Sequence, residues 1–142
     1  VERFLNILKP KRIYLGEKDM QQFKILEDFI KKKFKKTKIV CCKTVRENNG
    51  LAYSSRNFLL TRKQKNIGSN VYNFIKSNKK KILKNSISLL NIKKNILFLG
   101  VDKIDYVKII NLNKIIKPYK KTKKYKIFIA YYLKTTRLID NI

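Results

Sequence analysis

The spacing of apolar residues predicts alternating helices and strands in the first third of the chain. Residues 1–8 place their apolar side chains on one helix face, and Pro10 ends that helix. A short β-leaning run over 13–15 follows and is closed by Gly16. From Asp19 the apolar positions again recur every three or four residues, which predicts a helix through residue 34.

Residues 38–45 form a second short, β-branched run, so the order is strand, helix, strand. That order and those lengths predict one βα unit of a parallel sheet. The segment 46–50 then has turn chemistry, of which Asn49-Gly50 is the strongest signal. We therefore place a domain boundary in this segment.

After the boundary the pattern predicts helices first and strands later. Thr61 and Gln64 form a capping-box pattern, so a helix should begin at Arg62 and run through Ile75, and a further helical stretch is predicted over 82–90. Strands are predicted at 96–99, 106–110 and 125–132, with a lysine-rich loop over 117–124. Two helices followed by a small antiparallel sheet are typical of an α+β unit.

The charge is strongly positive, and the second half of the chain is the more basic because most of the acidic residues precede Thr61. Lys and Arg number 36 against 9 Asp and Glu, which gives a formal net charge of +27. A basic face attracts phosphate backbones and anionic membrane surfaces. Here the lysines are scattered through predicted helices, strands and loops rather than along one stripe, so we give the charge little weight. A hydrophobic content of 44% indicates a globular protein.

A nucleic-acid-binding module remains the alternative from another functional class. It would use a sheet of stacking aromatic residues: Tyr125, Phe128, Tyr131 and Tyr132. Alternating aromatic residues on a strand are more often core, and the run lacks a recognisable RNA-binding motif, so we regard nucleic acid as a disfavoured partner.

Other features point to a cytoplasmic protein without a membrane segment. No apolar run reaches transmembrane length, and no signal peptide is visible. Cys41 and Cys42 are neighbours in an extended run, where a disulfide between them would be strained, so they are interpreted as small strand residues in a reducing compartment. The chain has no histidine, which removes the commonest zinc ligand.

The first candidate site is the segment GEKDMQQ, residues 16–22. A strand that ends in Gly16 and opens a helix presents backbone N–H groups and the positive helix end at the carboxyl edge of the sheet. Lys18 suits a phosphate, Asp19 a ribose or a metal, and Gln22 offers a donor and an acceptor. In the other interpretation Asp19 and Gln22 form a capping box and Lys18 is a solvated lysine.

The second candidate site is the segment GLAYSSRN, residues 50–57. Ser54 and Ser55 beside Arg56 give several donors on a predicted mobile loop, with no carboxylate nearby to neutralise them. Such a loop can close on a polyphosphate and stabilise charge that develops on a leaving group. The alternative is a polar interdomain linker with an N-cap serine.

Together the two segments resemble the pantothenate synthetase family, the pantoate beta-alanine ligases. That family carries GEKDxQQ, then a VRE-type turn and GLAxSSRN in the same order and at the same spacing as here, where the turn is residues 45–47. The closing RLIDN at 137–141 and the segment IDYV at 104–107 are also similar to the family's. Position 53 is Tyr where the family usually has Leu or Met.

The resemblance implies an ATP- and Mg²⁺-dependent ligase that joins pantoate and β-alanine through a pantoyl adenylate and releases AMP and pyrophosphate. It implies that Gln22 binds pantoate and that Lys18, Ser54, Ser55 and Arg56 are catalytic. The ATP site would comprise Gly16, Glu17, Lys18, Asp19, Val45, Tyr53, Ser54, Ser55 and Arg56. No metal ligand is assigned beyond Asp19 as a candidate. Other adenylate-forming enzymes of the same nucleotidyltransferase superfamily are the nearest alternative.

The family's histidine-bearing first half has no counterpart in these 142 residues, so we expect a fragment of a longer enzyme. The resemblance implies an α/β fold in which residues 1–46 end a Rossmann-like parallel-sheet domain and residues 47–142 form a small α+β domain with helices and an antiparallel sheet. It also implies a cytoplasmic homodimer at full length.

Overall fold

The fold is described for most of the chain. The computed structural model describes residues 1–115 and 124–142, apart from the side chain of Lys114. Nearly all of the lysine-rich loop predicted over 117–124 lies outside the described residues. Among the described residues, no helix combines the length and the apolar character that a membrane crossing requires.

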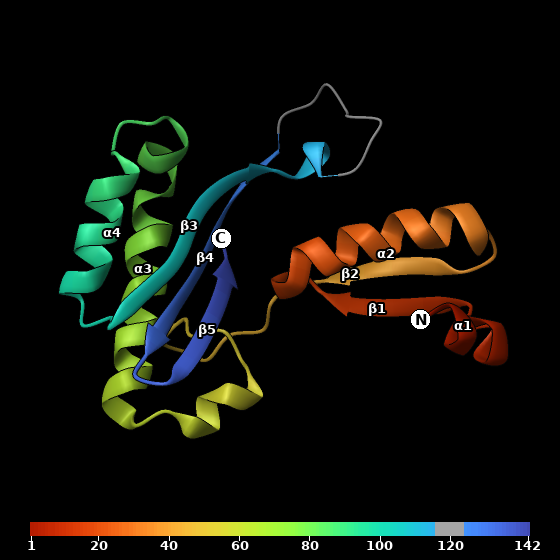
Figure 1. Ribbon diagram of the computed structural model, residues 1–142, viewed down its shortest axis with the longest axis horizontal. Helices are drawn as coiled ribbons and strands as arrows, with labels where there is room; N and C mark the ends of the chain where they lie inside the picture. Colours follow the sequence, from red (N-terminus) through yellow and green to blue (C-terminus); the bar gives the residue numbers. More distant parts are fainter. Residues whose placement is uncertain (116–123) are drawn as a thin grey trace. The chain divides into compact units, whose positions relative to one another are not determined.

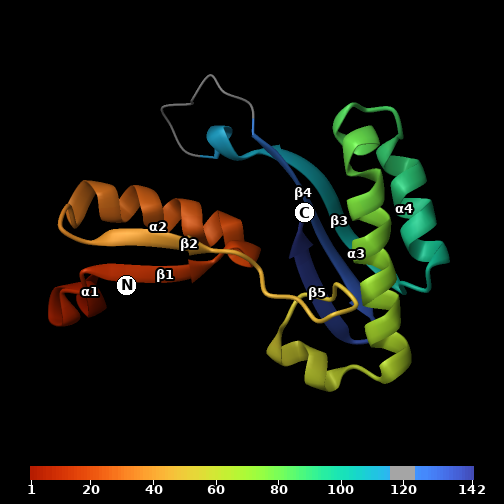
Figure 2. The ribbon, with the colours of Figure 1, turned by 180° about the vertical axis from the view of Figure 1, so that it is seen from behind.

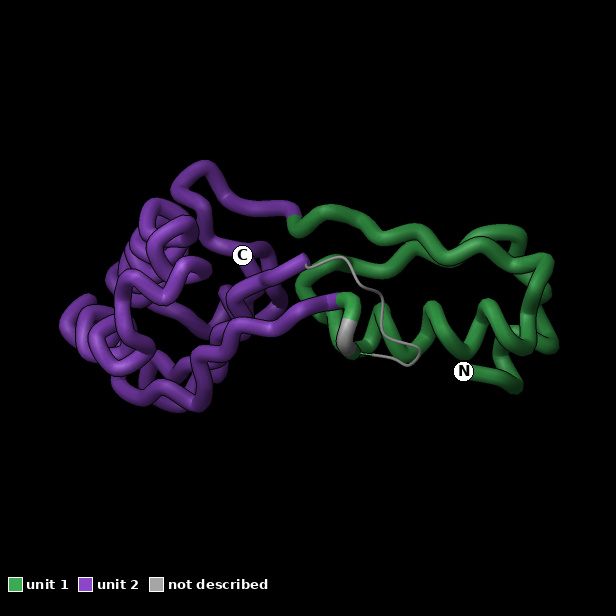
Figure 3. The backbone as a smooth tube through the Cα atoms, turned by 90° about the horizontal axis from the view of Figure 1, so that it is seen from above, with its two compact units in different colours: residues 1–44, 113–121 green, residues 45–112, 122–142 purple. Residues whose placement is uncertain are grey.

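The chain divides into two compact units, which are coloured separately in Figure 3. Unit 1 comprises residues 1–44 and 113–121, and unit 2 comprises residues 45–112 and 122–142. The chain passes from unit 1 to unit 2 between Thr44 and Val45. Each candidate segment therefore belongs to a different unit.

Unit 1 is a β-α-β arrangement preceded by a short helix. Its elements are α1 (Glu2–Leu8), β1 (Arg12–Gly16), the 3-10 turn η1 (Glu17–Asp19), α2 (Met20–Lys33) and β2 (Lys38–Cys42). The two strands pair in parallel, with Arg12 opposite Lys38 and Gly16 opposite Cys42, and α2 runs alongside them (Figure 1). The predicted βα unit is confirmed, although β2 ends three residues before the predicted strand does.

Helix α2 is amphipathic, as its sequence pattern predicts. It buries Met20, Phe23 and Ile30, while its last turn is basic and so suits the negative end of the helix dipole. On the polar face, burial of the Glu27 carboxyl acts to raise its pKa, but hydrogen bonds and charges from Lys31 and Lys24 outweigh burial and lower the pKa.

Unit 2 is a three-stranded antiparallel sheet with two helices packed on one face (Figures 1 and 2). Its elements are η2 (Ser55–Leu59), α3 (Arg62–Leu83), α4 (Leu89–Phe98), β3 (Lys103–Asn111), β4 (Tyr125–Leu133) and β5 (Thr136–Asn141). A further 3-10 turn, η3 (Leu112–Lys114), follows β3. The strand order is β3-β4-β5, so each strand pairs with its neighbour along the chain.

The helices of unit 2 begin where capping residues stand. Thr61 accepts from the backbone N–H of Gln64, and the Gln64 side chain accepts from the backbone N–H of Thr61, so the predicted capping box is confirmed. Ser88 accepts from the backbone N–H of Asn91 at the start of α4. Apolar side chains of both helices meet the sheet in one core that includes Val71, Ile75, Ile92, Ile96, Ile127 and Ile129.

Two predictions about this part of the chain are wrong. The predicted strand 96–99 is the end of α4, because Ile92 and Ile96 are one helical turn apart and both fully buried. Phe98 is 92% exposed and so lies outside the buried helix face, but in the sequence it makes the apolar run continuous, as in a buried strand. The helical stretch predicted over 82–90 is interrupted by a turn, in which Asn85 takes a positive φ of 56°.

The central strand β4 is buried on both faces. Phe128 and Tyr131 are 9% and 3% exposed, and Ala130 between them is completely buried. Rings buried in this way cannot stack on bases, so Phe128 and Tyr131 cannot serve the binding platform of the nucleic-acid alternative, whereas Tyr125 is 40% exposed and Tyr132 is half-buried. The strand β5, which no periodicity predicted, pairs with β4 from Thr136 to Asn141.

Candidate functional site

The GEKDMQQ segment lies where sequence reasoning put it, at the carboxyl end of a parallel strand. Gly16 is the last residue of β1, residues 17–19 form η1, and α2 begins at Met20. Met20 is buried and so anchors the segment to unit 1. In open α/β sheets this edge is where ligands bind, because several loops and helix N-termini converge there.

The predicted capping box of this segment is not formed. Asp19 is the N-cap residue of α2, but its side chain makes no capping hydrogen bond, and its φ and ψ of −96° and 52° lie outside the usual N-cap region. Asp19 and Gln22 are both exposed. Helix capping therefore does not account for these two polar side chains.

Neither the backbone conformation nor the packing within the protein requires glycine at position 16. Its φ of −67° and ψ of 136° are open to any residue, and a Cβ built there would have no heavy atom within 4 Å. Space that the protein's own atoms leave open beside a strand end allows close approach of another molecule to the backbone. Glu17 and Lys18 are half-buried beside it.

The donor set of unit 1 suits a metal ion only when another group supplies most of its ligands. Among residues 1–115 and 124–142, no group of three or more His, Cys, Asp or Glu side chains could hold a metal ion. Magnesium commonly takes one or two protein carboxylates together with substrate phosphates and water. Asp19 fits the part of a single carboxylate in such a site.

The GLAYSSRN segment follows a tight turn in unit 2. Arg46 and Ala52 form an isolated antiparallel bridge, and the backbone N–H groups of Glu47 and Tyr53 donate to the carbonyls of Leu51 and Val45. Within the turn, Gly50 has a positive φ of 96°, where a side chain would be strained. The predicted turn at 46–50 is confirmed, and Val45 stands at its start.

Beyond the turn, the chain presents its polar side chains to solvent. Ser54 accepts from the backbone N–H of Arg56 and caps the 3-10 turn η2, as predicted for an N-cap serine. Tyr53, Ser55 and Arg56 are exposed. The Arg56 guanidinium has no ion-pair partner among the residues that the structure describes.

A cavity of about 430 Å³ lies beside this segment. It is lined by Glu47, Tyr53, Ser54, Ser55, Asn57, Phe58 and Lys65. The sequence interpretation of a loop without a nearby carboxylate is therefore wrong, because the turn brings Glu47 to the same cavity as both serines. Lys65 lines it too, so the local charge is mixed.

Asn57 fixes the base of the segment. Its side-chain NH₂ group donates to the Ala52 carbonyl at 3.1 Å and to the Glu47 carboxylate at 3.2 Å. Both partners are acceptors, which fixes the orientation of the amide. The other amide atom, Oδ1, is buried without a hydrogen-bond partner among the described residues. A water or ligand donor would satisfy this acceptor.

Sequence reasoning missed the residues that hold the turn. The Arg46 guanidinium makes two hydrogen bonds to the Asp140 carboxylate, one to the Gly50 carbonyl, and stacks on the Tyr72 ring with 3.9 Å between Cζ and the ring centroid. Arg46 and Asp140 stand 94 positions apart. Only their place in the VRE-type and RLIDN segments marks them in the sequence.

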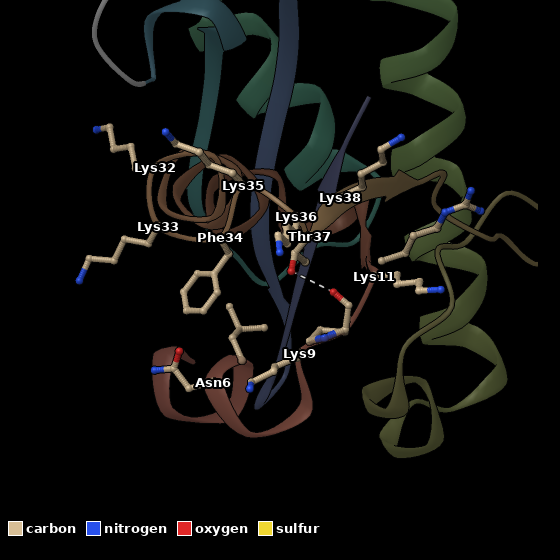
Figure 4. Close-up of a pocket in the computed structure, with 13 residues that line it drawn as sticks. Asn6, Lys9, Lys11, Lys32, Lys33, Phe34, Lys35, Lys36, Thr37 and Lys38 are labelled. Atoms are coloured by element: carbon tan, nitrogen blue, oxygen red, sulfur yellow. Dashed lines mark hydrogen bonds between the residues drawn. The ribbon is translucent and has the colours of Figure 1, made fainter.

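Unit 1 also contains a larger cavity, at the opposite end of its strands from Gly16. The cavity measures about 930 Å³ and is lined by residues 5–6, 9–12 and 32–38. Figure 4 shows lysine side chains around it and the hydrogen bond from the Thr37 hydroxyl to the Pro10 carbonyl. None of the predicted site residues lines this cavity.

The structure thus places the predicted site residues in two groups. Gly16, Glu17, Lys18, Asp19 and Gln22 lie together in unit 1, and Val45, Tyr53, Ser54, Ser55 and Arg56 lie together in unit 2. Each group is exposed or half-buried, as a ligand-binding segment requires.

Solved structures similar to this chain support the fold. A pantothenate synthetase from Thermus thermophilus superimposes with a TM-score of 0.77 at 24% identity, over 99% of this chain and 52% of that one. A pantoate-beta-alanine ligase from Francisella tularensis, described as complexed with beta-gamma ATP and beta-alanine, gives a TM-score of 0.73 at 34% identity. That match covers 99% of this chain and 46% of the other.

Sequence comparison agrees over the whole chain. The pantothenate synthetase of Endomicrobium trichonymphae is 35% identical over 146 residues, which is 100% of this chain and 51% of that protein. The enzyme of Clostridioides difficile is 34% identical, over 99% and 51%. The chain therefore spans about half the length of these relatives. Because the family model for pantoate-beta-alanine ligase matches residues 1–142, the chain belongs to the pantoate-beta-alanine ligase family.

Proposed function

We propose that the protein carrying this chain condenses pantoate with β-alanine at the expense of ATP. The observation that carries the proposal is the family match over all 142 residues. The exposed polar segments of the two units add to it, because both carry donors that suit a phosphate-bearing ligand. The similar Francisella tularensis protein, complexed with beta-gamma ATP and beta-alanine, supports the same substrates here.

The reaction has two steps and no covalent enzyme intermediate. In the first, a carboxylate oxygen of pantoate attacks the α-phosphorus of ATP, the bond to the bridging oxygen breaks, and pyrophosphate leaves. In the second, the amine of β-alanine attacks the acyl carbon of pantoyl adenylate, loses a proton, and expels AMP. Negative charge grows on pyrophosphate in the first transition state, so donors aimed at that charge speed the step.

In this proposal both segments contribute residues that bind the substrates. Lys18 and Arg56 would meet the charge on the phosphates, and Ser54 and Ser55 would donate hydrogen bonds to them. Gln22 would hold pantoate. The backbone at Gly16 and Glu17 and at Val45 and Tyr53 would contact the nucleotide. Mg²⁺, when bound to ATP, neutralises phosphate charge, and Asp19 is the residue that would complete its ligands.

Pantoate-dependent exchange of pyrophosphate into ATP tests the proposal in the full encoded protein. Lys18→Ala and Arg56→Ala should each slow the exchange by about 10²–10³-fold, the effect of removing one donor from a developing charge. Lys63→Ala, a change to an exposed lysine at the start of α3, is the control and should retain the wild-type rate. Wild-type rates in both site variants would show that the residues are wrongly assigned.

The acid requires a separate test, because other adenylate-forming enzymes share this chemistry. A panel of carboxylic acids in the exchange assay decides it. Exchange with pantoate supports the proposal, and exchange only with another acid assigns the chain to a different substrate. We also infer a cytoplasmic homodimer, as the family resemblance implies, and sedimentation of the full encoded protein would measure its subunit number.

A further inference from the structure

Arg46 and Asp140 form a well-shielded ion pair, and Arg46 lies in the turn that precedes residues 54–56, here called the SSR segment. The two Arg46 NH groups lie 2.7 and 2.9 Å from the two carboxylate oxygens, the parallel two-bond geometry that arginine and a carboxylate favour. The side chains are only 17% and 11% exposed. Shielding of this degree strengthens the Coulomb attraction between the two groups and makes loss of either partner costly.

Arg46 connects three parts of unit 2 through one guanidinium. Asp140 belongs to β5, Gly50 belongs to the turn, and Tyr72 belongs to α3. The Gly50 carbonyl accepts at 3.1 Å, and the guanidinium lies close enough over the Tyr72 ring for a cation–π contact. Arg46 thereby ties the turn to both layers of unit 2.

The turn is tied in the same way to the segment that follows it. Glu47 accepts from the Asn57 side chain, and Asn57 also donates to the Ala52 carbonyl. On the helix side, the carbonyl of Asn49 accepts from Ser69 and from Asn73. The backbone N–H of Tyr53 donates to Val45 in the turn, and that of Asn57 donates to Ser54, so the turn and Asn57 both contribute to the placement of residues 53–56.

We propose that Arg46 and Asp140 are positioning residues for the phosphate-binding residues 53–56. They touch no substrate in this scheme; they fix the turn, and the turn fixes the donors. The inference rests on the proposed function for its catalytic consequence, whereas its structural part concerns unit 2 alone.

Arg46→Lys and Asp140→Asn are the informative variants. Lysine keeps the positive charge but cannot make two parallel bonds to a carboxylate or stack as guanidinium does. Asparagine keeps the shape of aspartate and removes its charge. Lysine keeps a positive charge opposite Asp140, whereas asparagine takes the counter-charge away from Arg46 but keeps one oxygen as a hydrogen-bond acceptor, so the two variants weaken the pair in different ways.

The chain supplies a matched control on the same strand. Arg137 of β5 donates twice to Asp105 of β3, at 2.7 and 3.0 Å, but the side chains are 37% and 41% exposed. These two hydrogen bonds join β5 to β3 and do not involve the turn. Both of these bonds end on one carboxylate oxygen, so Arg137→Lys and Asp105→Asn alter a more exposed Arg–Asp pair of unit 2 that does not contact the turn.

The experiment combines amide hydrogen exchange with steady-state kinetics on the full encoded protein. In Arg46→Lys and Asp140→Asn, exchange should rise at least about tenfold within residues 46–57 and stay unchanged in α3 and β4. The kcat for pantoate-dependent adenylation should fall about 10–100-fold, because a small misplacement of donors has effects of this size. The Arg137→Lys and Asp105→Asn variants should match wild type in both measurements.

Three results would overturn the inference. The first is wild-type exchange within residues 46–57 in both Arg46→Lys and Asp140→Asn. The second is faster exchange throughout unit 2, with kcat falling only in proportion to the folded fraction, which would mean a general structural role. The third is an equal loss of kcat in the control pair. If the wild-type protein lacks pantoate-dependent activity, the proposed function fails, and the exchange measurements still decide whether Arg46 and Asp140 hold the segment.

Discussion

Replacement of Gly50 by alanine should destabilise unit 2 strongly. Gly50 has a φ of 96°, and a Cβ there would lie 2.7 Å from one ring carbon of Tyr72 and closer still to its neighbour. A strained backbone of this kind costs about 1–3 kcal/mol for a residue with a side chain. Overpacking against a fixed neighbour typically adds about 1–3 kcal/mol. The two effects together predict a loss of about 2–6 kcal/mol.

Movement of the ring has a cost, because the ring also contacts Arg46. Tyr72 stacks under Arg46, which is bound in turn to Asp140. A displaced ring would therefore weaken the support of the turn as well. Since a domain of this size has a total stability of about 5–15 kcal/mol, the loss is a large share of the whole.

Urea denaturation followed by circular dichroism measures the effect. With a slope of about 1–3 kcal/mol per molar urea, the midpoint for unit 2 should fall by on the order of 2 M. The control for stability is Gly16→Ala, where a Cβ meets nothing within 4 Å and φ is −67°, so little change is expected.

A double-mutant cycle separates the clash from the backbone strain. In a Tyr72→Ala background the ring is gone, so Gly50→Ala should retain only the backbone part, about 1–3 kcal/mol. A wild-type urea midpoint for Gly50→Ala would refute the reasoning. So would a penalty that is equally large with and without the Tyr72 ring, because the clash would then contribute nothing.

Three further predictions concern separate features. Gly16→Ala should leave stability unchanged but weaken ATP binding at least about tenfold, because the methyl group fills the space left open at the strand end. Calorimetry on the full encoded protein measures the affinity. An unchanged affinity for ATP would show that Gly16 is not part of the site. Burial, reinforced by the charge of Asp140, raises the pKa of Tyr131 above its ordinary value near 10. The folded state then keeps a proton that the unfolded chain loses, so the free energy of unfolding of the wild type should fall above about pH 10, by up to about 1.4 kcal/mol per pH unit. Tyr131→Phe should lack this component. The comparison is between urea midpoints measured at about pH 9 and about pH 11. An equal pH dependence of the urea midpoint in wild type and Tyr131→Phe would contradict the role of Tyr131. Thr61→Ala removes the N-cap acceptor of α3 and should cost about 0.5–2 kcal/mol in the same assay, whereas an unchanged midpoint would show that the cap contributes nothing.

Local patterns predicted the elements whose signals are local. The capping box at Thr61, the turn at Asn49-Gly50 and the βα unit of residues 12–42 each depend on neighbouring residues, and each is confirmed. The run at 96–99 failed because an exposed Phe98 extends an apolar stretch that, in three dimensions, is one face of a helix. Over so short a run, the periodicity of apolar residues cannot distinguish a buried strand from one face of a helix.

The candidate site was predicted to the extent that its segments are contiguous in sequence. The residue patterns of 16–22 and 50–57 could be recognised in the sequence, and both segments contain exposed polar side chains, among them Asp19, Gln22 and Arg56. The supporting contacts could not be recognised, because Arg46 meets its carboxylate partner 94 positions further on. The position of Glu47 beside the serines likewise follows from the turn, which folds the chain back on itself.

The distance along the chain between Arg46 and Asp140 also orders events during protein synthesis. The turn and both helices of unit 2 are synthesised before β5, because synthesis runs from the N-terminus. Arg46 acquires its carboxylate partner only when the last strand is released and pairs with β4. A chain stopped before Asp140 should therefore leave the SSR segment without the carboxylate that Arg46 binds through the turn.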